Sequence, residues 1–142
     1  MAAFVKFQQF VEDLGVGVHN LNTGTLNVYL SNAAPSTTDD SVKTDLAEIT
    51  NQNGYTAPVD TQNTYEQNAG VATLVGTAIT ITASGAVGPF QYVVLYNDTP
   101  TSPADPLIGY WNYGSAITMA SGETFTIKFN NSATTGTILT IE

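Results

Sequence analysis

The sequence predicts an all-β protein, an antiparallel β-sandwich with one short helix near the N-terminus. Apolar and polar residues alternate with a period of two over most of the chain after residue 24. Turn-forming stretches such as ASGAVGP at 83–89 and SGE at 121–123 separate the alternating runs. Helical periodicity is confined to the first residues. Many short strands with little helix are typical of a sandwich.

The N-terminal segment has the spacing of an amphipathic helix over residues 3–14. Its apolar residues recur at intervals of three and four, and they are Phe4, Phe7, Phe10, Val11 and Leu14. Gly15 then ends the helix. Residues 1–20 are therefore interpreted as a helix or arm with an aromatic stripe. The stripe either covers an open end of the protein's own sheet or docks on a neighbouring subunit.

Period-two alternation predicts the strands that follow. The clearest are 25–31, where Leu26, Val28 and Leu30 share a face, 79–82 and 124–129. These strands are expected to be buried on one face only. Further strands are expected at 71–75, 90–97, 107–113, 116–119 and 136–142. Long excursions between the strands favour a jelly-roll or related Greek key over a simple meander.

Two long segments lack this alternation. Residues 32–68 form a polar insertion with a short helix expected at 42–49, and a second loop spans 97–106. Irregular segments of this length in a small protein tend to be functional loops or arms ordered by partners. With 142 residues, no internal repeat and no cysteine, the chain is expected to form one domain, 1–142, without disulfides.

Charge excludes several classes of partner. The chain has 12 acidic residues against three lysines and no arginine, which gives a net charge of −9. Nucleic acid and anionic membranes are bound chiefly through Lys and Arg clusters, so neither is expected as a partner. No apolar run is long enough for a membrane span. The first residues do not have the pattern of a secretory signal, so synthesis in a cytoplasm is expected.

Catalytic and metal-binding patterns are absent from the sequence. His19 is the only histidine and there is no thiol, so no nucleophile has an evident base and no imidazole or thiolate metal site is expected. The acidic residues fall mainly in loops, where no acid and base pair stands out. Calcium in these loops stays an open alternative, although their spacing is not that of an EF-hand. We expect no enzyme activity and no cofactor.

Two strands carry more aromatic surface than a sandwich core needs. In 90–96, Phe90, Tyr92, Val94 and Tyr96 are expected on one face, with Val93 and Leu95 on the other. In 107–113, Leu107, Trp111 and Tyr113 are expected on one face, with Ile108 and Tyr110 on the other. Both faces of these strands need a cover. It is either the protein's own helix or loops, or a subunit or partner interface, where Tyr and Trp are enriched.

The order of several phrases resembles small proteins encoded among tailed-phage head genes. These phrases are FVKFQQFVEDL, HNL, a strand ending in SNAAP, NGYTA, FQYVVLYNDT, PLIGYW and GETFTIKF. Some of these proteins are decoration, or cement, proteins with jelly-roll-like folds. The resemblance implies a structural virion protein that binds the outer surface of an assembled capsid and bridges subunits of the major capsid protein, often as a dimer or trimer.

From this resemblance the expected function is to cement neighbouring capsid subunits against internal DNA pressure. The residues expected to contact the partner or another copy are Phe4, Phe7, Phe10, Tyr96, Tyr110 and Trp111. The alternative is a tail-associated or carbohydrate-binding module that uses Tyr110, Trp111 and Tyr113 as a stacking surface.

Overall fold

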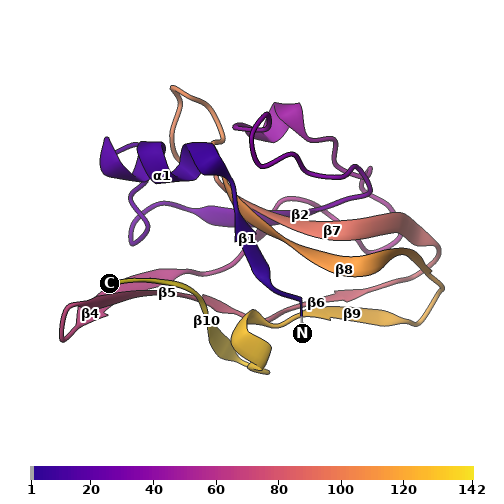
Figure 1. Cartoon of the computed structure of the whole chain (residues 1–142). Helices are drawn as coiled ribbons and strands as arrows, with labels where there is room; N and C mark the ends of the chain where they lie inside the picture. The colour runs from indigo at the N-terminus through magenta and orange to yellow at the C-terminus, as the bar shows by residue number, and fades with distance from the viewer. Residues whose placement is uncertain (1) are drawn as a thin grey trace.

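The strands of the protein form two facing layers (Figure 1). This computed structural model describes residues 2–142. The first layer is a five-stranded sheet in the order β1-β8-β7-β2-β3. Its strands are β1 (Phe4–Lys6), β2 (Leu26–Ser31), β3 (Val59–Asp60), β7 (Val87–Asn97) and β8 (Leu107–Met119).

The second layer consists of two smaller sheets that lie end to end (Figure 1). One has the order β10-β5-β4 and the other pairs β6 with β9. Only Ala78 separates β5 from β6, and its N–H donates to the Thr134 carbonyl at 2.6 Å, next to the break between β9 and β10. The strands are β4 (Thr64–Asn68), β5 (Val71–Thr77), β6 (Ile79–Thr82), β9 (Thr124–Ile127) and β10 (Thr135–Ile141).

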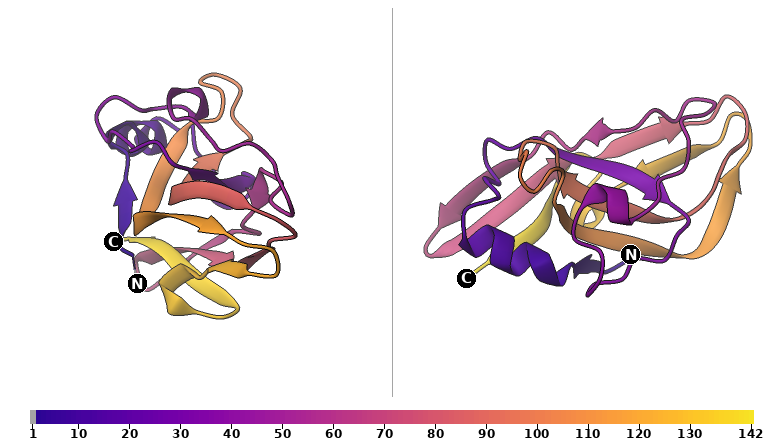
Figure 2. Two further views of the ribbon diagram at one scale, coloured as in Figure 1. Left: turned by 90° about the vertical axis from the view of Figure 1, so that its right-hand side faces the viewer. Right: turned by 90° about the horizontal axis from the view of Figure 1, so that it is seen from above.

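All the strand pairs of both layers are antiparallel. The prediction of an all-β antiparallel sandwich with one short helix is therefore confirmed. The jelly-roll connectivity stays a prediction. The chain crosses between the layers after β3, β6 and β8 (Figure 2).

The N-terminal prediction is wrong in its first half. Phe4–Lys6 is a strand that pairs with β8, and the helix α1 is Gln8–Gly15. Phe7 precedes the helix, and Val11 is 54% exposed, so the five apolar residues do not form one helical stripe. Phe4 is held by long-range pairing to Trp111, because three residues added to a sheet edge gain hydrogen bonds that a short exposed helix end lacks.

The main core lies between the two layers. Phe90, Leu95 and Ile108 from the first layer pack with Leu74 and Ile81 from the second. Phe10 of α1 joins this core at one end of the sandwich, where its ring contacts His19 at 5.1 Å between centroids. The helix thus contributes to the main core through one aromatic side chain.

A second apolar cluster covers the outer face of the five-stranded sheet. Phe7 and Leu46 pack there on Tyr29, Tyr96 and Leu107. All six residues of β2 are consequently buried, so the expectation that this strand is buried on one face only is wrong. On this outer face, the cover that the aromatic strands need is supplied by the chain's own arm and insertion.

Bulges shift the faces of the two aromatic strands. The register of β7 and β8 slips between Phe90 and Tyr92 and between Leu95 and Tyr96. Phe90 therefore lies in the main core, whereas Tyr96 lies in the outer cluster. Likewise Leu107 packs with Tyr110, and Ile108 with Trp111. The predicted faces are therefore wrong at Phe90, Leu107 and Ile108, because an extra residue inverts the alternation there. Tyr92, Val94 and Tyr96 share a face as predicted.

The insertion 32–68 contains more regular structure than expected. Its last part forms β3 and β4, and the helix expected at 42–49 is reduced to the 3₁₀ turn η1 (Lys43–Asp45). A second 3₁₀ turn, η2 (Phe129–Asn131), follows β9, where the sequence predicts continued strand. The strand expected at 116–119 is the end of β8. No helix in the described part of the chain is long and apolar enough to cross a membrane.

Candidate functional site

Three of the predicted contact residues are buried inside the chain's own fold. Phe7, Phe10 and Tyr96 are 0%, 4% and 2% exposed. A partner would reach these side chains only after the arm or the insertion had left the sheet. The surface that a partner meets must therefore be made largely by other residues.

The other three predicted residues are half-buried and lie on two different faces. Phe4 packs against Trp111 with ring centroids 5.1 Å apart and the rings tilted, and the Phe129 ring lies 5.5 Å from the same indole. Tyr110 instead packs with Phe7 at 5.5 Å in the outer cluster. Trp111 belongs to the side of the sheet that faces the second layer.

The expected stacking surface of three rings is consequently divided. Tyr110 points to one side of β8, while Trp111 and Tyr113 line the hollow on the other side. The Trp111 indole also has Phe4 and Phe129 as neighbours, so it does not present a free flat face. A sugar-binding platform made of these three rings does not exist in this fold.

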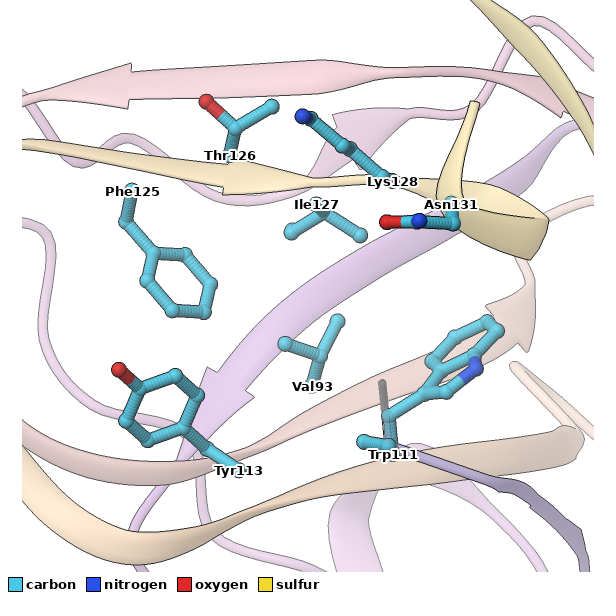
Figure 3. A pocket seen from close by; sticks show the side chains of 9 residues that line it. Val93, Trp111, Tyr113, Phe125, Thr126, Ile127, Lys128 and Asn131 are labelled. Atoms are coloured by element: carbon cyan, nitrogen blue, oxygen red, sulfur yellow. The ribbon is translucent and has the colours of Figure 1, made fainter. Parts of the chain in front are cut away.

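A hollow lies instead between β8 and β9, on an open side of the sandwich. Figure 3 shows Tyr113 and Phe125 on one side of it, Trp111 on the other, and Val93 and Ile127 between them. Its volume is about 280 Å³. Tyr113 is 56% exposed and its ring lies 5.7 Å from that of Phe125. The hollow is a small apolar site with aromatic walls.

Charge is distributed unevenly between the two layers. Eight of the twelve acidic residues lie in α1, in the insertion before β3 and in the loop between β7 and β8. These segments gather on the side of the five-stranded sheet that faces away from the second layer (Figures 1 and 2). We name these segments the acidic cap; its acidic residues are Glu12, Asp13, Asp39, Asp40, Asp45, Glu48, Asp98 and Asp105, of which Asp13 is buried.

The outer face of the second layer is rich in threonine and nearly free of charge. Thr80 faces Thr126 across the β6–β9 pair, and their hydroxyl oxygens are 3.2 Å apart. Thr77 faces Thr135, and Thr73 faces Thr140. Glu66 is the only charged residue within the five strands of this layer. We call this surface the threonine face; its further members are Thr64, Thr82, Thr124 and Thr137.

Two carboxyl groups of the acidic cap interact. Burial, and then the neighbouring Asp98, raise the pKa of Asp105, while Lys43 opposes the shift. Asp98 also accepts a hydrogen bond from the Asn27 amide at 3.1 Å. Among residues 2–142, no group of three or more His, Asp or Glu side chains is placed to hold a metal ion.

His19 is buried beside the helix. Its Nδ1 atom lies 3.3 Å from the Asn97 amide nitrogen, and its Nε2 has no hydrogen-bond partner in the described chain. Burial lowers the pKa of His19, and Asp13 partly opposes this effect. The imidazole lines none of the three hollows, so it has no evident access to a substrate.

The sequence pattern predicted neither the hollow between β8 and β9 nor the threonine face. The alternation in TFTI predicts Thr124 and Thr126 outward with Phe125 inward, which is correct. It contains no sign that Phe125 borders an open hollow, because that depends on how far the two layers separate along β8.

No protein-family model matches the chain, and no curated protein or solved structure is significantly similar to it.

Proposed function

We propose that this protein is a structural virion protein that decorates the outer surface of a tailed-phage capsid and cements neighbouring subunits of the major capsid protein. The observation that supports this proposal is the division of charge between the acidic cap and the threonine face. It adds to the resemblance in the order of sequence phrases described above.

The threonine face has the properties of a surface for protein contact. The centre of a protein interface is depleted in charge, and burying an unpaired carboxylate there is costly. The strands of this layer carry one charged residue, Glu66, whereas the acidic cap carries eight acids, seven of them not buried. The threonine face would therefore lie on the capsid lattice, and the acidic cap would point to solvent.

The proposed action is mechanical. Binding that prefers the mature lattice stabilises that lattice, and a dimer or trimer that bridges several subunits multiplies weak contacts. A contact of about 1,000 Å² per copy is enough for such binding. The site of action is the outer surface of the virion, after synthesis in the host cytoplasm. Nucleic acid and membrane are not partners in this proposal.

The test compares particles of the encoding phage assembled with and without this chain. Particles that lack it should release their DNA at a lower temperature, and adding the purified protein should restore the higher temperature. Hundreds of copies per virion are expected for a shell protein, whereas a handful would indicate the tail. Equal DNA retention with and without the protein would refute the cementing role.

A matched pair of variants tests which surface binds. The variants are Thr80→Lys and Thr101→Lys. Thr80 lies on the threonine face, and Thr101 lies in the loop between β7 and β8. Both side chains are exposed and both changes add one positive charge. Thr80→Lys should weaken binding to shells that lack the protein by about tenfold, since it buries an unpaired charge. Thr101→Lys should bind normally, and the reverse pattern would place the acidic cap on the capsid.

A further inference from the structure

The hollow between β8 and β9 is the middle of a longer groove. Trp111 and Ala2 line both this hollow and a second one beside β10, while Tyr113 and Phe125 line both it and a third one near the turn after β8. The three hollows therefore run one after another along the open side of the sandwich. A long, narrow site of this kind fits an extended chain better than a compact ligand.

One wall of the groove is the backbone edge of β9. Four consecutive residues, Phe125, Thr126, Ile127 and Lys128, line the central hollow. From β8, by contrast, only the alternate residues Trp111 and Tyr113 line it. Side chains of consecutive strand residues point to opposite faces, so a consecutive run indicates that the strand edge itself borders the hollow.

That strand edge is unpaired. Within residues 2–142, β9 pairs with β6 and with no other strand. Charged side chains and proline usually protect an exposed strand edge from further pairing, and the four residues TFTI include neither. On the opposite wall the edge of β8 already carries an added strand, because β1 pairs with it from Phe4, opposite Trp111, to Lys6, opposite Gly109. An added strand on β9 would repeat this arrangement in the other layer.

The charge at the groove is opposite to that of the protein. Lys128 lines the central hollow, and no acidic residue does. The only ion pair in the described chain joins Lys43 to Glu48, so Lys128 is unpaired although the sequence has 12 acids. Glu123 lies in the third hollow, where it accepts a hydrogen bond from the Ala120 N–H. The central hollow thus favours an acidic group beside apolar ones.

We propose that this groove binds an extended segment of a partner protein, which adds as a strand to the edge of β9. One apolar side chain of the segment lies between Trp111 and the Tyr113–Phe125 pair, and an acidic side chain lies at Lys128. Main-chain hydrogen bonds supply affinity in such complexes, and alternate side chains supply specificity. The inference goes beyond the capsid proposal and does not depend on it, because the segment is defined by its chemistry.

The test uses the full chain and an array of capped octapeptides. The peptides that bind should have apolar residues at alternate positions and should carry one acidic residue. Trp111 is the only tryptophan, so its fluorescence reports binding of a retained peptide in solution. The same peptide with alternate backbone nitrogens methylated should not bind, because it keeps the side chains and loses the main-chain donors. Amide exchange at 124–127 should slow in the complex.

Two exposed residues of the groove provide variants that keep the fold. Tyr113→Ala should abolish the fluorescence titration, and Lys128→Gln should weaken binding of the acidic peptide by about two- to fivefold. Lys6→Gln is the matched control, because Lys6 is exposed, carries the same charge and lines none of the hollows. It should bind like the unaltered protein.

Four outcomes would overturn the proposal. These are retention of no peptide, retention of lysine- and arginine-rich peptides, equal binding of the methylated peptide, and equal weakening by Lys6→Gln and Lys128→Gln. An aromatic carboxylate such as indole acetate that saturates the groove as tightly as the peptide would identify a small-molecule site instead. None of these outcomes bears on whether the protein binds capsids, so the two proposals fail independently.

Discussion

The ring of Phe4 occupies the space that a side chain on Gly109 would need. The two residues lie on the paired strands β1 and β8, and a Cβ atom at position 109 would collide with the Phe4 ring and the Val5 carbonyl. The absence of a side chain at Gly109 therefore lets the N-terminal strand lie close to the sheet and lets Phe4 reach Trp111.

Gly109→Ala should lower the free energy of unfolding by about 1–3 kcal/mol, because it forces an atom into a filled site. Urea denaturation followed by tryptophan emission measures the change. Gly15→Ala is the control, since nothing lies within 4 Å of a Cβ there and alanine is the better helix former. Equal effects of the two substitutions would contradict the close packing of β1 on β8.

Phe4→Ala should also destabilise the protein, by about 2–3 kcal/mol for a partly buried ring. The loss in the double variant with Gly109→Ala should be smaller than the sum of the two single losses, because the alanine then has room where the ring was. A double-mutant cycle in urea checks this coupling. Strict additivity would mean that the ring does not lie against Gly109.

Stability should fall at alkaline pH. Burial raises the pKa of Tyr96 to about 12, and it raises the pKa of Tyr29 and of Tyr55 as well, from an ordinary value of 10.0. The folded state therefore keeps its phenol protons where the unfolded chain loses them, so this stability is complete below pH 10 and is lost as the pH rises towards the folded values. Urea titrations across this range measure it.

The variant Tyr55→Phe separates ionisation from hydrogen bonding. The Tyr55 hydroxyl accepts a buried hydrogen bond from the Leu30 N–H at 2.9 Å, so its loss should cost about 1–3 kcal/mol at neutral pH. The alkaline loss of stability should become shallower. Tyr113→Phe, at an exposed ring, should change neither quantity, and a similar change in both variants would refute the assignment.

A second loss of stability is expected on the acidic side. Burial lowers the pKa of His19 below its ordinary 6.5, with Asp13 opposing in part. The unfolded chain therefore takes up a proton first, and the free energy of unfolding should fall as the pH drops from about 6.5 towards the folded value. His19→Gln should remove this component of the pH dependence. An unchanged profile in His19→Gln would show that the carboxyl groups alone cause the loss.

Local alternation correctly predicts most of the strands but not the side of the sheet on which each residue lies. Strands β6 and β9 follow their pattern residue by residue, and in β2 Leu26, Val28 and Leu30 share a face as predicted although both faces are buried. In β7 and β8 the bulges invert the alternation, and a bulge depends on the partner strand, which local periodicity does not include. Alternation alone therefore cannot predict which face of the sheet Phe90 and Ile108 occupy.

The N-terminus shows a different limit. A spacing of three between Phe4, Phe7 and Phe10 is compatible with a helix, and only the distant strand β8 makes 4–6 extended. The groove depends on the same kind of information. Its walls, β8 and β9, are joined along the chain by the turn after β8 but belong to different layers. The width of the gap between them follows from how the two layers pack, which no single stretch of sequence specifies.

The separation of the acidic cap from the threonine face places most of the negative charge of the molecule on one side of it. Near a negatively charged surface such a molecule rotates before it touches, because its acid-bearing side is repelled over about 10 Å at moderate salt. Collisions would then occur mostly with the threonine face in front. A particle coated in this way would present a uniform layer of negative charge to its neighbours, which would keep concentrated particles dispersed.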